Sequence, residues 1–120
     1  MIIPGTKCLQ KVSGEEIAKK TIECLKKNVP PEVPGIAFLS GGQSELEASK
    51  NLNEINKIND TSFLITFSYG RGLQASALKA FGNDLNDIKK IQNVFAHRAK
   101  MNGFSSKGQW SENLEQEAVA

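Results

Sequence analysis

The sequence has few of the residues that build disulfide frameworks or metal sites. Only two cysteines and one histidine occur among 120 residues. Cys8 and Cys24 are too few for a disulfide framework, and no CxxC motif or cluster of histidines indicates a zinc site. We therefore expect reduced thiols and no metal site.

Long apolar runs and blocks of like charge are also missing. No apolar stretch approaches the roughly 20 residues that cross a bilayer, and the first residues lack the charged segment and apolar run of a signal peptide. The net charge is +2, with Lys and Glu interspersed, so we expect neither nucleic acid nor a membrane as a partner. A soluble, cytoplasmic protein is the expectation.

The composition, with 39% hydrophobic and 23% charged residues, is that of a chain that forms a core. Residues 14–28 have apolar side chains at helical spacing, beginning at Ser13 and ending at Pro30-Pro31. Ser13 and Glu16 fit a capping box at the start of this helix.

Two strand, loop and helix units follow. Residues 33–39 form a short apolar run before Ser40-Gly41-Gly42, and Ser44 with Glu47 fits a second capping box at the start of a helix. Residues 63–67 form another apolar run, before a loop over 68–72 and a helix from residue 73. We expect both strands to be buried on both faces.

A last helix is predicted over residues 85–101. Its expected core face carries five apolar residues: Leu85, Ile88, Ile91, Phe95 and Ala99. We expect His97 to be a solvated residue, since no carboxylate or cysteine partner is evident. Residues 1–102 are predicted to form the βα units and residues 103–120 a mobile tail, with Trp110 as its only large apolar residue.

The alternation of strands and helices predicts an α/β fold with parallel strands. Two strands do not make a stable sheet alone, so the segment is expected to need neighbouring strands. A chain of this length is too short for a complete (β/α)8 barrel, which needs roughly 250 residues.

The two loops after the strands occupy matching places. Glycine lets a backbone come close to a ligand, and the free N–H groups and dipole of a helix start favour an anion. Arg71 adds donors that suit a phosphate. Tight turns of purely structural origin are the alternative for each loop, but the pair and its arginine indicate a phosphate site.

These residues also carry a family resemblance. Residues 33–45, residues 64–79 with Thr66-Phe67-Ser68-Tyr69-Gly70-Arg71 at their centre, and the opening Met1-Ile2-Ile3-Pro4-Gly5 closely resemble class I, Schiff-base-forming fructose-bisphosphate aldolases. The resemblance implies a glycolytic and gluconeogenic lyase that cleaves fructose 1,6-bisphosphate to dihydroxyacetone phosphate and glyceraldehyde 3-phosphate. The fold class that it implies is the C-terminal portion of a (β/α)8 (TIM) barrel, made of the last two strands with their helices. It implies no cofactor and no metal, and a homotetramer at full length.

The resemblance assigns the substrate phosphate to Ser40, Gly41, Gly70 and Arg71. Leu39, Gly42 and Ser68 are the expected neighbours of that site. It assigns no catalytic residue to this chain, because the Schiff-base lysine of the family lies in a Lys-Pro-Asn segment just upstream of the position of Met1. The chain alone is therefore predicted to be inactive.

The sequence departs from the family at two places. Gly72 stands where the family commonly has alanine, and we expect it to loosen the first turn of the helix slightly. The family commonly ends in a tyrosine that visits the active site, whereas this sequence ends in Glu117-Ala118-Val119-Ala120. A contribution of such a tyrosine to turnover is in doubt here.

Two other functions stay open at the level of sequence. One is a non-catalytic, truncated module that binds a partner or supports assembly, and the other is a different phosphate-binding barrel enzyme. An in-frame Lys-Pro-Asn upstream of Met1 would favour truncation of an aldolase over the module.

Overall fold

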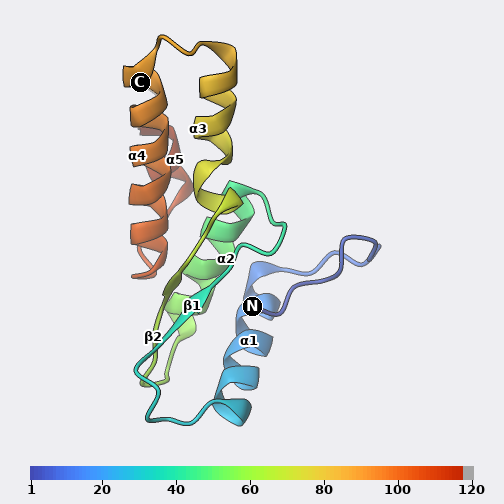
Figure 1. Cartoon of the computed structure of the whole chain (residues 1–120). Helices are drawn as coiled ribbons and strands as arrows, with labels where there is room; N and C mark the ends of the chain where they lie inside the picture. The colour runs from blue at the N-terminus through green and yellow to red at the C-terminus, as the bar shows by residue number, and fades with distance from the viewer. Residues whose placement is uncertain (118–120) are drawn as a thin grey trace.

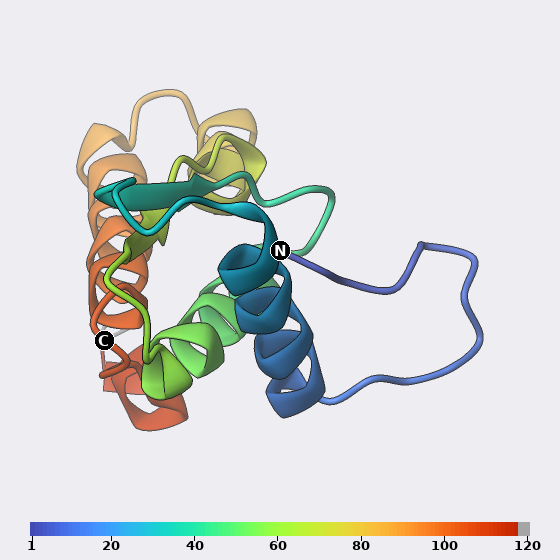
Figure 2. The same cartoon turned by 90° about the horizontal axis from the view of Figure 1, so that it is seen from below.

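The computed structural model describes residues 1–117 as an α/β fold in which helices and strands alternate (Figure 1). The elements in order are α1 (Gly14–Asn28), β1 (Gly35–Phe38), α2 (Glu45–Ile58), β2 (Leu64–Phe67), α3 (Arg71–Asn83), α4 (Ile88–Ser105) and α5 (Glu112–Glu117). Residues 1–13 form an irregular arm that loops away from the helices (Figure 2). The predicted helix over 14–28 and the two predicted strands are confirmed, although both strands are shorter than expected.

Local sequence signals fix where α1 and α2 begin. The Ser13 side chain accepts a hydrogen bond from the backbone N–H of Glu16 (3.2 Å), but no reciprocal bond closes a capping box there. At α2 the predicted box is complete, because Ser44 and Glu47 bond to each other's backbone N–H groups. Caps of this kind act over three residues and need no tertiary contact.

The two strands pair in parallel, with Gly35 opposite Leu64 and Phe38 opposite Phe67. Helix α2 makes the crossover between them and is the centre of the packing, in contact with α1, β2, α3 and α4. Figures 1 and 2 show α1 and α2 on one side of the sheet. The core lies between these helices and the sheet and contains Ala18, Ile22, Ala48, Leu52, Ile55, Phe63, Ile65 and Tyr69.

The prediction that both faces of the strands are buried is wrong for the described chain. Ile65 is only 3% exposed on the face toward the helices, whereas Leu64 is 78% exposed on the other face. Within residues 1–117 no helix covers that second face. The strands therefore carry more apolar surface than the described residues bury.

The predicted core face of the last helix is wrong at three of its five residues, while Ile91 and Ala99 are half-buried. Leu85, Ile88 and Phe95 are 57%, 54% and 40% exposed. The beginning of α4 lies beside α3 alone, and it is the later part of α4 that reaches α2 (Figure 1). The residues of α4 that become buried are Arg98, Met101, Asn102 and Ser105.

Residues 103–117 pack against the rest of the chain, which differs from the predicted mobile tail. Helix α4 continues through Ser105, past the predicted boundary at residue 102. Trp110 is 7% exposed, and its backbone N–H donates to Asn53 Oδ1 (3.0 Å). The prediction rested on polar composition, in which the only tryptophan of the chain, Trp110, could anchor the tail. Residues 118–120 lie outside the described part of the chain.

Candidate functional site

The two predicted loops lie side by side because β1 and β2 are parallel neighbours. Their carboxyl ends meet at one edge of the sheet, where the Ser68 backbone N–H donates to the Phe38 carbonyl (2.8 Å). The loop Ser40-Gly41-Gly42 leaves β1 and the loop Ser68-Tyr69-Gly70 leaves β2 at this edge. The fold thus brings together the two halves of the predicted anion site.

Ser40 joins the two loops. Its side chain is almost fully buried, at 5% exposed, and its hydroxyl oxygen accepts a hydrogen bond from the Gly72 backbone N–H (3.3 Å). Gly72 is itself buried, and a Cβ added there would lie 2.8 Å from Ser40 Cβ. The expectation that Gly72 merely loosens a helical turn is therefore incomplete, since this glycine also permits the close approach of Ser40.

Gly41 and Gly42 present an open backbone. Both have positive φ, 61° and 87°, and no other atom of the described chain lies within 4 Å of a Cβ built on either. Glycine adopts this left-handed conformation at no steric cost, and exposed N–H groups in such a loop suit an anion. These two residues are the most accessible backbone of the first loop.

The two helix starts are not equivalent. The Glu47 carboxylate accepts from both the N–H and the hydroxyl of Ser44 (2.9 Å each), so α2 begins with its own anion. These two hydrogen bonds, the backbone one foremost, hold the pKa of Glu47 below its ordinary value. A ligand phosphate would therefore meet the Gly41-Gly42 backbone, not the first turn of α2.

Helix α3 begins in the opposite way. Its N-cap is Gly70, which has no side chain of its own, and Arg71 is its first residue; the Ser40 hydroxyl accepts from the Gly72 N–H of the first turn. Arg71 is exposed at the same edge as the glycine loop. This helix start, which has no acidic side chain in its first turn, and the guanidinium together form the positively charged half of the predicted site.

The three residues predicted to border the phosphate site are all exposed, but they differ in their backbone hydrogen bonds. Leu39 is 71% exposed and Gly42 is exposed, so both border open space beside the loops. Ser68 is exposed as well, although its backbone N–H is taken by Phe38. Tyr69, between Ser68 and Gly70, is buried and donates from its hydroxyl to the Ala48 carbonyl (3.0 Å), which fixes the second loop to α2. Burial raises the pKa of the Tyr69 phenol.

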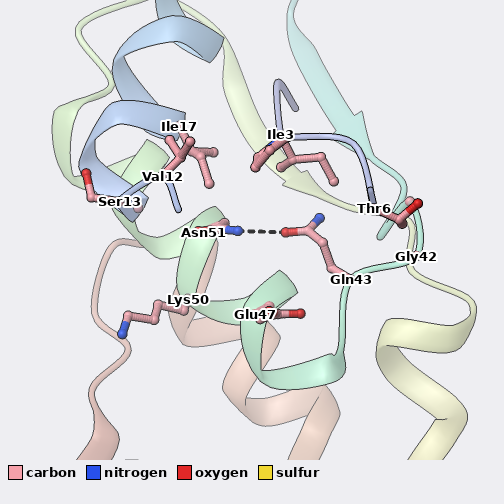
Figure 3. A pocket seen from close by; sticks show the side chains of 13 residues that line it. Ile3, Thr6, Val12, Ser13, Ile17, Gly42, Gln43, Glu47, Lys50 and Asn51 are labelled. Atoms are coloured by element: carbon pink, nitrogen blue, oxygen red, sulfur yellow. Dashed lines mark hydrogen bonds between the residues drawn. The ribbon is translucent and has the colours of Figure 1, made fainter. Parts of the chain in front are cut away.

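A cleft of about 570 Å³ lies beside the first loop, between the arm of residues 1–13 and helices α1 and α2 (Figure 3). Gly41 and Gly42 are on its border, whereas Ser40, Gly70 and Arg71 are not part of its lining. Ile3 and Ile17 provide apolar walls. The Gln43 and Asn51 amides meet inside it.

Sequence reasoning gave Gln43 and Asn51 no role. Gln43 lies within the motif that carries the family resemblance, but only its position directly after two glycines distinguishes it. In the structure its amide contacts Ser40 and Asn51. An amide side chain next to a glycine pair is the signal that could have indicated a residue that fixes the loop.

A second polar cluster lies away from the strand ends and was also missed. His97, predicted to be solvated, has a side chain only 13% exposed, and its Nε2 lies 3.2 Å from Glu115 Oε2. The partner that sequence reasoning did not find is 18 residues away, on α5.

In the part of the chain that the structure describes, no three His, Cys, Asp or Glu side chains are grouped so that they could hold a metal ion. None of the helices described has the length and apolar character needed to cross a membrane.

Comparison with known proteins gives consistent matches over nearly the whole chain. The family model described as "Fructose-bisphosphate aldolase class-I" matches residues 1–120. Fructose-bisphosphate aldolase B of Sparus aurata is 51% identical over 112 residues, which cover 92% of this chain and 30% of that protein. Fructose-bisphosphate aldolase C of Rattus norvegicus is 49% identical over 111 residues, covering 92% of this chain and 31% of the relative.

A solved structure agrees in fold. The fructose-bisphosphate aldolase of Plasmodium falciparum, crystallised with TRAP and a small-molecule inhibitor, superimposes with a TM-score of 0.85 at 40% identity. The match covers 89% of this chain and 31% of that one. The chain thus spans about a third of the length of the curated relatives that it matches.

Proposed function

Because the chain belongs to the class I fructose-bisphosphate aldolase family, we propose that it is the C-terminal part of a (β/α)8 aldolase barrel and supplies the loops that hold the phosphate of a ketose substrate. In this proposal β1 and β2 are the last two strands of the barrel. The 78% exposure of Leu64 and the 71% exposure of Leu39 support it, since such apolar residues need cover from further strands and helices.

The observation that carries the proposal is the junction of the two loops. Ser40 and Gly72 are joined by a hydrogen bond of 3.3 Å, so the Gly41-Gly42 backbone and the start of α3 with Arg71 lie at one edge of the sheet. In barrels of this class, loops after the last strands together with a helix start form a common phosphate site.

The chemistry of the whole protein follows from the family resemblance. A lysine on the strand before residue 1 forms an imine with fructose 1,6-bisphosphate, and the protonated imine withdraws electrons from the carbon–carbon bond that breaks. The products are dihydroxyacetone phosphate and glyceraldehyde 3-phosphate, which makes the protein a lyase of glycolysis and gluconeogenesis. Residues of this chain contribute by position: a phosphate held by two loops keeps the ketone within reach of the lysine.

Replacement of Arg71 by alanine tests the proposal in the full-length protein, meaning the natural polypeptide that contains this sequence. A hydrogen bond to a charged group is worth about 1.5 to 3 kcal/mol, and the exposure of Arg71 favours the lower end. We expect the KM for fructose 1,6-bisphosphate to rise about tenfold. Cleavage of a substrate without the relevant phosphate should change little.

Lys79→Ala is a suitable control, because Lys79 is an exposed cation on the same helix, two turns from its start. It should leave the KM unchanged. Equal losses for phosphorylated and unphosphorylated substrates in Arg71→Ala would contradict the assignment of a phosphate ligand.

The assembly and location of the full-length protein are part of the proposal. The family resemblance implies a homotetramer, and the sequence predicts a location in the cytoplasm. Light scattering on the purified full-length protein measures the first, and fractionation of its native cells measures the second. A monomer that cleaves fructose 1,6-bisphosphate at full rate would contradict the assembly while leaving the proposed reaction intact.

A further inference from the structure

Gln43 is bonded to the phosphate loop at one carbonyl group. Its side-chain Nε2 donates to the Ser40 carbonyl oxygen (2.8 Å), and its backbone N–H donates to the same oxygen (3.1 Å). A carbonyl only accepts hydrogen bonds, so Nε2 and not Oε1 must face Ser40. This orientation leaves Oε1 directed at α2.

Asn51 completes the connection. Its Nδ2 donates to Gln43 Oε1 (2.7 Å), and Figure 3 shows the two amides meeting in the cleft. Asn51 lies on α2, whose neighbour Leu52 is fully buried in the core. The chain of contacts therefore runs from a rigid helix through Gln43 to the carbonyl that precedes the two glycines.

Two consecutive glycines need such a restraint. Gly41 and Gly42 both have positive φ, a conformation that glycine visits but does not prefer over its many alternatives. A free Gly-Gly segment loses more backbone entropy on ordering than any other pair of residues. Unless the protein restrains this loop beforehand, a bound phosphate must supply that ordering free energy.

Ser40 is held at both of its polar groups. Its carbonyl accepts from Gln43, and its hydroxyl oxygen accepts from the Gly72 N–H at the start of α3. A shift of the Gln43 amide would therefore move Ser40 and change the position of one loop relative to the other. The Gln43 amide is not available as a phosphate ligand itself, because Nε2 and Oε1 are both engaged inside the chain.

We infer that Gln43 and Asn51 are positioning residues for the ketose-phosphate site, which act through the Ser40 carbonyl and hold the Gly41-Gly42 backbone ready for a phosphate monoester. The inference rests on the proposed function. Preorganisation of a flexible loop improves affinity by removing the ordering cost from the binding step.

The test uses two replacements of Gln43 in the full-length protein. Gln43→Glu keeps the shape of the side chain but places a carboxylate against the Ser40 carbonyl, and Gln43→Met keeps the length without any strong donor. Inorganic phosphate, as a competitive inhibitor of fructose 1,6-bisphosphate cleavage, reports on the loop directly. We expect its inhibition constant and the KM to rise about tenfold in both variants, with a smaller change in kcat.

Asn56→Ser is the matched control. Asn56 is also an amide on α2 that donates to carbonyls, those of Leu52, Ile65 and Ser105, but it lies away from the loops. We expect this variant to lower the melting temperature and to leave the inhibition constant of phosphate unchanged. This result would show that a loss of stability alone does not reproduce the effect expected at Gln43.

The outcomes separate the inference from the function on which it rests. A wild-type protein that neither cleaves fructose 1,6-bisphosphate nor binds inorganic phosphate contradicts the proposed function. If the wild type binds phosphate, Arg71→Ala weakens that binding and both Gln43 variants bind as the wild type does, the inference about Gln43 is overturned and the phosphate site remains.

Discussion

The Arg98 guanidinium and the Glu115 carboxylate form a two-bond ion pair that joins α4 to α5. Nη1 lies 2.8 Å from Oε1 and Nη2 lies 2.9 Å from Oε2, with both side chains largely buried. The same carboxylate accepts from the Trp110 indole N–H (2.7 Å). One acidic residue thus holds the segment that sequence composition had indicated to be mobile.

Glu115→Gln should release this segment. The replacement leaves the Arg98 charge in a site where its side chain is only 10% exposed, and breaking such a pair costs about 3 kcal/mol. We expect amide hydrogen exchange over residues 106–117 of the full-length protein to accelerate by up to about 100-fold. Asp60→Asn, which breaks the exposed pair of Asp60 with Lys26, is the control and should leave this exchange unchanged. Unchanged exchange in Glu115→Gln would mean that Trp110 alone anchors the segment.

The attachment of α5 should depend on pH in an acidic range. Burial by itself raises the pKa of the Glu115 carboxyl, but hydrogen bonds from Arg98 and Trp110 and the charge of Arg98 outweigh burial and lower it below its ordinary value of 4.5. A carboxyl whose pKa is depressed in the folded state stabilises it fully above the ordinary pKa, and loses that contribution as pH falls through the depressed value.

We therefore expect Glu115 to protect the amides of residues 106–117 from hydrogen exchange equally well from neutral pH down to about 5. Below 4.5 this protection should decrease, once the rates are corrected for intrinsic exchange. Protection in Glu115→Gln should lack this step. The Arg98 guanidinium, the His97 ring and the Trp110 indole N–H are the groups that face the carboxylate. A step that persists in Glu115→Gln would assign the acid sensitivity to another group.

Gly72→Ala should disturb the junction of the two loops. A new Cβ at 2.8 Å from Ser40 Cβ must displace Ser40, at a cost of about 1 to 3 kcal/mol, while the gain in helix propensity offsets about 1 kcal/mol. The family resemblance places alanine here, so the loop can yield, and we expect a net loss near 1 kcal/mol. The KM for fructose 1,6-bisphosphate should rise by a few-fold, with kcat less affected.

Gly82→Ala is the matched control, since it lies on the same helix and its added Cβ meets no atom within 4 Å. It should stabilise α3 slightly, because alanine favours a helix over glycine. Equal KM values and equal stabilities in the two alanine variants would show that the close approach of Ser40 does not require a glycine at position 72.

The 120-residue chain produced alone should lack a cooperative folding transition. Leu64, Leu39 and Leu78 are 78%, 71% and 63% exposed, and in the described residues each strand of the two-stranded sheet has only one neighbour. Such surfaces bind hydrophobic dyes and favour aggregation. Differential scanning calorimetry on a monodisperse sample gives the measurement. A sharp transition with equal calorimetric and van't Hoff enthalpies would show an autonomous domain and would favour the non-catalytic module.

The sequence by itself determined α1, α2, the two strands and the loops that follow them. Ser13 and Ser44 define helix starts through bonds to residues three positions away, Pro30 cannot continue α1, and the glycines after each strand define the loops. Caps and turns are local, so a pattern in the sequence is sufficient to predict them. Parallel pairing followed from the helix between the two strands.

Only the tertiary structure decided which polar groups meet. Ser40 and Gly72 are 32 residues apart, and His97 and Glu115 are 18 apart, so neither contact leaves a periodic signal in the sequence. Burial was decided in the same way: Leu64 and Ile65 are both apolar neighbours in one strand, yet only Ile65 faces a helix. Side-chain contacts between distant segments depend on how whole elements dock, and that docking is a property of the packed core.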